Sequence, residues 1–195
     1  MKNQRCDWCG NDPLYVEYHD NEWGVPVFDD AKLFEFLILE TFQAGLSWIT
    51  VLKKRENFRV AFDGFNYKKI ATYNEAKFNE LLKNKGIIRN KLKIKATISN
   101  AVAFMEVQKE FGSFSKYIWK FVNGKPLKNT YKTLNEVPAT TALSEIISKD
   151  LKKRGFKFVG STVIYAHMQA TGMVNDHITT CFRYQEIVDL NNKEM

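Results

Sequence analysis

Two pairs of cysteine and histidine residues lie at opposite ends of this chain, and they constrain its fold more than any other feature. Sulfur and imidazole nitrogen are the ligands of a tetrahedral structural zinc site, and such a site takes four of them. Neither pair could hold the metal tightly alone, whereas both together would tie the two ends of the chain across the folded protein. The four residues are Cys6, His19, His177 and Cys181.

The spacing leaves the set of ligands open. His177 and Cys181 are four residues apart, so one turn of helix would place both side chains on the same face. Near the N-terminus, Cys6 and Cys9 also form a CxxC half-site, which competes with His19. Five candidates therefore compete for four places. The alternative is that all five are ordinary residues, because buried cysteine is common in proteins without a metal.

The length of 195 residues predicts a single domain over 1–195, and 45% hydrophobic residues with 15 phenylalanines indicate a substantial core. Met1 to Arg5 is polar and is not followed by an apolar stretch, so nothing resembles a signal peptide. No run approaches the ~18 apolar residues of a membrane span. Three cysteines make a poor disulfide framework. We therefore expect a cytoplasmic protein without a membrane partner.

The positive charge of the chain indicates a polyanionic partner. The formal net charge is +7, and such an excess is typical of proteins that bind nucleic acid. The alternative is a set of solvated helix faces. The basic residues gather in three clusters, at 53–55, 83–95 and 149–157.

The hydrophobic pattern predicts an all-α fold. The segment before Asp30 is rich in turn residues, and Asp29 or Asp30 is a good N-cap for a helix that is apolar nearly all round and therefore buried. No strand-like alternation is sustained, and we expect a frayed end after Tyr184. Further helices are expected at about 47–61, 67–72, 75–83, 91–111, from 113, at 141–153 and at 161–170, with a loop at 123–138.

Glu40 is the side chain that most suggests chemistry. It follows apolar residues by one turn of the buried helix, and a buried carboxylate is costly unless it is paired, hydrogen-bonded or used. Trp48, Tyr15 and Tyr18 lie nearby in sequence. Aromatic rings around a carboxylate make a receptor for a flat, cationic ligand that donates hydrogen bonds. The alternatives are an ion pair for Glu40 and core packing for the rings.

A short segment between two expected helices has the character of a phosphate-binding hairpin. Leu151–Gly160 contains Gly155 and Gly160, five residues apart. Exposed backbone amides at such a junction, together with the N-terminus of the next helix, can hold a DNA phosphate. The alternative is that glycine serves only as a helix C-cap.

Taken together, these residues resemble the DNA-3-methyladenine glycosylase I family. The resemblance runs from about residue 6 to residue 181, and its long blocks make chance agreement unlikely. The matching stretches are Cys6-x-Trp8, 12–26, Leu39-Glu40, 43–57, 86–89, 151–160 and 174–177.

The resemblance implies a monomeric helix-hairpin-helix glycosylase that releases free 3-methyladenine from double-stranded, alkylated DNA. It implies one structural zinc ion held by Cys6, His19, His177 and Cys181, with Cys9 left out. The implied domain has a helical body at 30–170, with its hairpin at 154–160, and terminal segments at 6–29 and 171–184 that the zinc joins.

The resemblance also assigns roles to individual residues. Glu40 is implied as the catalytic residue, and it shares the base pocket with Trp8, Tyr15, Tyr18 and Trp48. The hairpin residues implied in DNA binding are Lys153, Arg154, Gly155, Phe156, Lys157 and Gly160.

The implied mechanism begins with the damaged base flipped out of the duplex, which costs a few kcal/mol and is partly offset by stacking on aromatic rings. Glu40 accepts hydrogen bonds from the amino edge of the base, and an oxocarbenium-like sugar captures water. Asp176 either acts as in other helix-hairpin-helix glycosylases or only orients His177. Ser161 and Thr162 follow Gly160 where relatives with lyase activity carry a lysine, so base release without lyase activity is expected.

Two other functions are compatible with the residues. One is a zinc-stabilised DNA-binding module without catalysis, which would bind DNA in a salt-dependent manner and be indifferent to damaged bases and to Glu40. The other keeps the enzyme class but acts on a different alkylated base.

Overall fold

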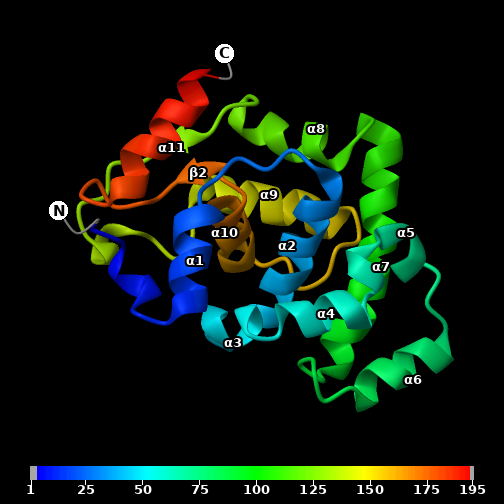
Figure 1. Ribbon diagram of the computed structural model, residues 1–195. Coiled ribbons are helices and arrows are strands. Elements are labelled where there is room, and N and C mark those ends of the chain that lie inside the picture. Colours follow the sequence, from blue (N-terminus) through cyan, green and yellow to red (C-terminus); the bar gives the residue numbers. More distant parts are fainter. Residues whose placement is uncertain (1–3, 194–195) are drawn as a thin grey trace.

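Helix α2, Asp30–Gln43, lies at the centre of the molecule with other helices around it (Figure 1). The computed structural model describes residues 4–193. Asp29 caps α2, since its side chain accepts a hydrogen bond of 2.9 Å from the backbone N–H of Lys32. Every residue from Leu33 to Phe42 is buried. The prediction of a buried helix that starts at Asp29 or Asp30 is therefore confirmed.

Helices form nearly all of the regular structure in the described residues, which confirms the all-α fold. A two-residue parallel pairing joins β1, Leu127–Lys128, to β2, Val174–Asn175. The remaining α-helices are α1 (Pro13–Asn21), α3 (Trp48–Leu52), α4 (Arg55–Ala61), α5 (Tyr67–Ile70), α6 (Glu75–Lys83), α7 (Lys91–Phe111), α8 (Phe114–Trp119), α9 (Ala142–Lys153), α10 (Ser161–Ala170) and α11 (Phe182–Lys193). Short 3-10 turns cover Asp7–Cys9, Asp63–Phe65, Lys120–Val122 and Leu134–Glu136.

The N-terminal segment is more regular than its turn residues predict. Asp12 and Pro13, read from the sequence as a turn, start α1 instead. The Asp12 side chain accepts a 3.1 Å hydrogen bond from the N–H of Leu14, and Pro13 occupies the first helical position. Proline is favoured there because its fixed φ suits the helix and its missing N–H is not needed.

The helix predicted over 47–61 is broken in two at Lys53 and Lys54. The break turns the chain, and Arg55 in the first turn of α4 is buried beside Glu35 of α2 at 2.6 Å. A buried guanidinium needs such a partner, so the ion pair gives the break a physical reason.

The C-terminal segment also differs from expectation. His177 and Cys181 lie in a bend and turn between β2 and α11, so the predicted helical turn is wrong. Helix α11 forms where a frayed end was expected. Its start is tied to the other end of the chain, because the N–H of Phe182 donates to the carbonyl of Gln4 at 3.0 Å.

The two ends of the chain meet along a close backbone contact, seen in Figure 1 where the blue and orange segments lie side by side. The N–H of Val27 donates to the carbonyl of Thr171 at 3.0 Å. Gly172 has φ +68°, and a Cβ there would lie 2.4 Å from the carbonyl carbon of Val25. Only glycine allows this approach without strain.

Among residues 4–193, no helix combines the length and the apolar character needed to cross a membrane.

Candidate functional site

A cavity of about 380 Å³ lies between α1, the last turn of α2, the start of α3 and α10. The segment 134–138 and the stretch after β2 complete its wall. All five residues proposed for the base pocket line it, so the structure brings them together from four separate parts of the chain. They are Trp8, Tyr15, Tyr18, Glu40 and Trp48.

Glu40 places an unsatisfied carboxyl oxygen in the cavity. Its side chain is 3% exposed, and its Oε2 atom has no hydrogen-bond partner among the described residues. Burial alone raises the pKa of Glu40 to about 8, because the charged form loses its hydration without gaining a partner. The alternative interpretation, an ion pair for Glu40, therefore finds no partner within residues 4–193. An unpartnered carboxyl in a cavity is a strong candidate for a functional group.

The aromatic residues surround this carboxyl. The ring centroids of Tyr18 and Trp48 are 5.4 Å apart, and those of Trp8 and Tyr15 are 5.0 Å apart. Burial, with a smaller contribution from Glu40, raises the pKa of Tyr18 well above its ordinary value. The indole N–H groups of Trp8 and Trp48 are buried and have no partner among the described residues. The cavity thus offers flat apolar walls together with unpaired donors and an unpaired carboxyl oxygen.

Asp176 lines the same cavity, and its carboxylate is fully engaged. It accepts hydrogen bonds from Asn129 Nδ2 at 2.6 Å, Tyr165 Oη at 2.6 Å and Gln169 Nε2 at 2.8 Å. The ring of His177 instead lies against the carbonyl of Trp23, with its Nε2 atom at 3.0 Å. The suggestion that Asp176 orients His177 is therefore wrong.

Two further cavity residues were missed from the sequence. Gln43 follows Glu40 by three residues on α2, so helical spacing could have found it. Gln169 reaches the cavity from α10 and also holds Asp176. No local pattern marks Gln169, because its position depends on how α10 packs against the stretch after β2.

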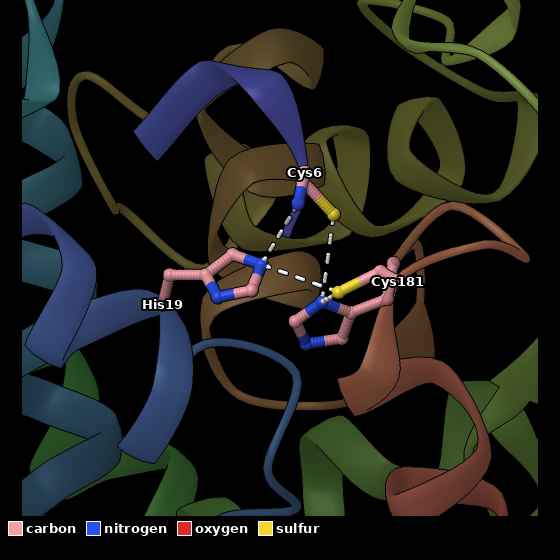
Figure 2. Close-up of side chains that lie close together, drawn as sticks. Cys6, His19 and Cys181 are labelled. Carbon is pink, nitrogen blue, oxygen red and sulfur yellow. Dashed lines mark hydrogen bonds between the residues drawn. The ribbon is translucent and has the colours of Figure 1, made fainter. Parts of the chain in front are cut away.

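The four candidate metal ligands come together at the meeting point of the two chain ends. Figure 2 shows Cys6, His19 and Cys181 pointing toward one another. Their ligand atoms and that of His177 all lie within 4.8 Å of one another, and all four residues are buried. The structure thus selects His19, and not Cys9, as the fourth member of this group.

The distances within this group suit a tetrahedral metal ion. Cys181 Sγ is 3.5 Å from His19 Nε2 and 3.5 Å from His177 Nδ1, and Cys6 Sγ is 3.6 Å from His177 Nδ1. Zinc bonds of ordinary length in a tetrahedron place sulfur and nitrogen roughly 3.6 Å apart. A buried Cys2His2 group of this geometry could hold a metal ion.

Each histidine of the group is oriented by its other ring nitrogen. His19 Nδ1 lies 2.7 Å from Asp20, which is itself paired with Arg5 at 2.7 Å. His177 Nε2 faces the carbonyl of Trp23. Such partners fix the tautomer, and they leave the nitrogens that face the group free to bind metal. The hydrogen bond with Cys6 holds the pKa of Cys181 well below its usual range.

The remaining cysteine and histidine have structural roles. The Cys9 thiol is buried and donates to the carbonyl of Cys6 at 3.2 Å. His167 is buried in α10, where its Nε2 lies 3.2 Å from the carbonyl of Leu33, and burial lowers the pKa of His167 to about 4. Neither residue belongs to the metal-binding group.

Trp8 connects the metal-binding group to the cavity. Its ring centroid lies 5.3 Å from that of His19 and 4.9 Å from that of Trp23, and on the cavity side its ring contacts Tyr15 and Tyr18. A metal at the group would therefore hold one aromatic wall of the cavity in place.

The hairpin residues proposed for DNA binding have different surroundings. Lys153 and Lys157 are exposed, whereas Phe156 is 1% exposed and anchors the hairpin in the core. Arg154 pairs with Asp150 at 2.7 Å and with Glu110 at 2.6 Å, so its charge is largely compensated. Helix α10 starts at Gly160 without a side-chain cap, which leaves its first N–H groups free of a side-chain acceptor.

The basic cluster at 53–55 is less available to a partner than its sequence indicates. Lys53 pairs with Asp12 at 2.7 Å. Arg55 is buried and pairs with Glu22 and Glu35. Two of its three charges are thus compensated within the protein.

A helical body with a hairpin between α9 and α10, beside a base-sized aromatic cavity with a buried carboxyl, defines a DNA glycosylase of the helix-hairpin-helix class. The family described as methyladenine glycosylase matches residues 8–184, and the chain belongs to this family. It is accordingly a hydrolase of N-glycosyl bonds, and its family acts in DNA base-excision repair. The interpretation as a binding module without catalysis is therefore wrong.

Individual relatives agree with this assignment. The chain is 51% identical over 181 residues to DNA-3-methyladenine glycosylase 1 of Escherichia coli (strain K12), covering 93% of this chain and 97% of the relative. A crystal structure of a 3-methyladenine DNA glycosylase I is 54% identical, with a TM-score of 0.90 over 92% of this chain and 98% of its own. Another, on 3-methyladenine recognition by the Staphylococcus aureus enzyme, is 35% identical, with a TM-score of 0.89 over 91% and 95%.

Proposed function

We propose that this protein removes 3-methyladenine from double-stranded, alkylated DNA by hydrolysing the N-glycosidic bond. The observation that carries the proposal is the unpartnered carboxyl of Glu40 in an aromatic cavity. The names of the relatives, which are 3-methyladenine glycosylases, support the choice of base. A different alkylated base remains the alternative substrate.

The chemistry of the base suits the cavity. Methylation at N3 makes the base cationic, so it leaves as a neutral molecule and needs little protonation by the protein. A cation beside Glu40 favours the ionised carboxylate and lowers its pKa from the raised value of about 8. Glu40 then accepts hydrogen bonds from the amino edge of the base. Normal adenine is neutral and gains less from this interaction.

The base reaches Glu40 by flipping out of the duplex. The cavity is recessed below the protein surface, so a base that stays stacked in the duplex could not enter it. Stacking on the rings of Trp8, Tyr15 and Trp48 contributes about 1–3 kcal/mol per base and offsets part of the unstacking cost. Leu46, 43% exposed in the turn between α2 and α3, is our candidate for the residue that fills the gap left in the duplex.

The reaction is release of the base without strand cleavage. A lyase needs an amine nucleophile at the sugar, and no lysine is among the described residues that line the cavity. Ser161 and Thr162, which follow the hairpin, carry hydroxyl groups only.

The hairpin binds the DNA backbone. The uncapped start of α10 offers N–H groups to a phosphate, and the exposed Lys153 and Lys157 add charge. Gly155, at φ +92°, and Gly160 give the turn its shape. Phe156 holds the hairpin from the core, and Arg154 holds it through ion pairs with Asp150 and Glu110.

One zinc ion bound by Cys6, His19, His177 and Cys181 has a structural role. The donor set of two sulfurs and two nitrogens at tetrahedral spacing is typical of a closed zinc site. When bound, zinc supplies a cross-link between the terminal segments 6–29 and 171–184.

We further propose that residues 1–195 form one domain, that it acts as a monomer, and that it resides in the cytoplasm, where its thiols stay reduced.

The test is to incubate the protein with methylated duplex DNA and to separate the released bases by chromatography. The proposal expects 3-methyladenine above the spontaneous rate, together with DNA strands that stay intact until alkali is added. If only other methylated bases are released, 3-methyladenine is not the substrate. Strand nicking without alkali would contradict the absence of lyase activity.

A further inference from the structure

The hairpin does not stand alone on the surface, because α7 holds it. The Asn100 side chain, fully buried in α7, accepts a 2.8 Å hydrogen bond from the N–H of Lys157 and donates a 3.0 Å bond to the carbonyl of Lys157. From α9, the Ser148 hydroxyl donates to the carbonyl of Val159 at 2.6 Å. Between these two clamps Phe158 adopts φ +56°, a strained conformation for a bulky residue. Asn100 therefore fastens the hairpin to α7 through two hydrogen bonds.

A groove of about 470 Å³ runs along the junction of α7 with the hairpin. Its wall is mainly apolar, although it lies at the surface. Leu92 is 66% exposed and Phe158 is 38% exposed. The residues that line it are Leu92, Lys95, Ala96, Ser99, Lys157 and Phe158.

Exposed cations lie in and beside this groove. Lys91, Lys95 and Lys157 are exposed, and none of them has an ion pair within residues 4–193. Some basic side chains elsewhere are compensated, for example Lys77 by Glu80 at 2.7 Å and Lys109 by Glu106 at 2.5 Å. Uncompensated charges around an apolar groove fit a partner that is both anionic and apolar at short range.

We propose that the first two turns of α7, together with the hairpin, form a DNA-binding surface that receives the backbone flanking the flipped nucleotide. The lysines contact phosphates, and the exposed faces of Leu92 and Phe158 pack against deoxyribose. This inference rests on the proposed function, because it assumes that the hairpin binds DNA. It extends the DNA contact from the hairpin to α7, which no feature of the sequence indicated beyond a basic cluster.

The occupant is DNA rather than a protein, since exposed lysines of both α7 and the hairpin, Lys95 and Lys157, line the same groove. Lys157 belongs to both the hairpin and the groove. A duplex seated on the hairpin carries phosphates on both sides of the contact, and each phosphate neutralised adds to the salt dependence of binding.

The test compares two double variants of the full protein that lose the same charge. Lys91→Gln/Lys95→Gln removes cations from the surface, and Lys116→Gln/Lys120→Gln removes two exposed cations from the region of α8, at the far end of α7 (Figure 1). The affinity for a duplex with a tetrahydrofuran abasic site is measured over a range of salt concentrations. We expect the first variant to bind roughly ten-fold more weakly, with a salt slope lower by about 2, and the second to match the wild type more closely.

A third variant, Leu92→Ser, separates apolar from charged contacts, because it should weaken binding several-fold without changing the salt slope. Base release by the first variant should show a raised KM and an unchanged kcat. Identical DNA affinity and salt slope in the two double variants would overturn the inference while leaving the hairpin proposal intact. If the wild-type protein itself fails to bind the duplex, the proposed function falls, and the inference falls with it.

Discussion

Glu40 meets opposite requirements in the free protein and in the reaction. Burial without a partner favours its protonated form and raises its pKa to about 8. A cationic base favours the carboxylate. The energy needed to ionise Glu40 is therefore returned only by a ligand that carries positive charge, which gives the residue a physical basis for discriminating damaged from normal adenine.

The first prediction concerns stability. A carboxyl whose folded pKa is raised contributes most stability below its unfolded pKa of 4.5, and this contribution is lost as the pH rises to about 8. The Glu40→Gln variant has no carboxyl to ionise, so its stability does not fall in this way as the pH rises. We expect the variant to unfold with a free energy a few kcal/mol higher than the wild type near pH 8, and with little difference near pH 4. Urea denaturation at both pH values measures this.

Glu17→Gln is the matched control, because Glu17 is exposed on α1. It should follow the wild type at both pH values. A Glu40→Gln variant that is less stable than the wild type at pH 8 would show that Glu40 has a stabilising partner.

The second prediction is a pH dependence of catalysis. The kcat/KM of a glycosylase reports groups of the free enzyme, and only the ionised fraction of Glu40 receives the cationic base well. We expect kcat/KM for methylated DNA to rise with pH and to level off near the Glu40 pKa of about 8. Steady-state rates across this range check it. A profile that falls as the pH rises toward 8 would mean that protonated Glu40 is the active form.

At the residue scale the sequence predicts the cavity well, because its central residues share one helix or lie near it in sequence. Glu40 and Trp48 flank the end of α2, so their proximity follows from local spacing. Asp176 and Gln169 could not be placed in the same way. Asp176 is held by Asn129 and Tyr165, and Gln169 is placed by its bond to Asp176. No local periodicity encodes these contacts.

Among the elements, the hairpin is the one whose shape depends most on its neighbours. Asn100 satisfies both backbone groups of Lys157, so its loss would leave a donor and an acceptor unpaired near the core. The third prediction is that Asn100→Ala is destabilised by about 1–3 kcal/mol and binds DNA more weakly. Its affinity for free 3-methyladenine should be unchanged, because the cavity is elsewhere. Val102→Ala, an exposed substitution on α7, is the control.

Equal loss of DNA affinity and of free-base affinity in Asn100→Ala would contradict a specific effect on the hairpin. Hydrogen exchange at residues 156–160 gives an independent readout, since loosening of the hairpin should appear there first.

The contact between the two chain ends allows a paired test with glycine. Gly172 and Gly124 have similar φ values, +68° and +73°, but only Gly172 lies against another backbone. The fourth prediction is that Gly124→Ala costs about 1 kcal/mol from φ strain alone. Gly172→Ala should cost clearly more, because its Cβ would clash with Val25. Thermal or urea unfolding measures both, and equal costs would contradict the close approach.

Most elements of the fold could be predicted because their caps and periodicity are local. Asn90, Ser113 and Thr141 each cap the helix expected to follow them. The break between α3 and α4 could not be predicted, since it follows from the ion pair of Arg55 with distant Glu35. The stretch that holds His177 and Cys181 is shaped by β2 pairing and by the chain ends meeting, again beyond local pattern.

For the whole molecule, the metal-binding group connects architecture to activity. Its candidate ligands come from the first and last parts of the described chain. Trp8 links them to the cavity, because its ring packs against His19 and lines the cavity wall. Loss of the metal would therefore loosen one cavity wall as well as the chain ends.

The fifth prediction separates ligands from neighbours. Cys181→Ala should hold clearly less than one equivalent of zinc and unfold at a lower temperature, because a structural metal stabilises the folded state directly. Cys9→Ala should keep a full equivalent, since Cys9 lies outside the group. Metal analysis of the purified proteins measures this, and full zinc in Cys181→Ala would refute the assignment.

If the Glu40 carboxyl is what recognises the damaged base in the cavity, single-turnover base release from methylated duplex DNA should depend on it. With enzyme in excess, the wild type and Glu17→Gln should release 3-methyladenine well above the spontaneous rate. Glu40→Gln should release it near that rate while keeping its fold and its zinc. Release by Glu40→Gln at the wild-type rate would show that the carboxyl is not needed for the reaction.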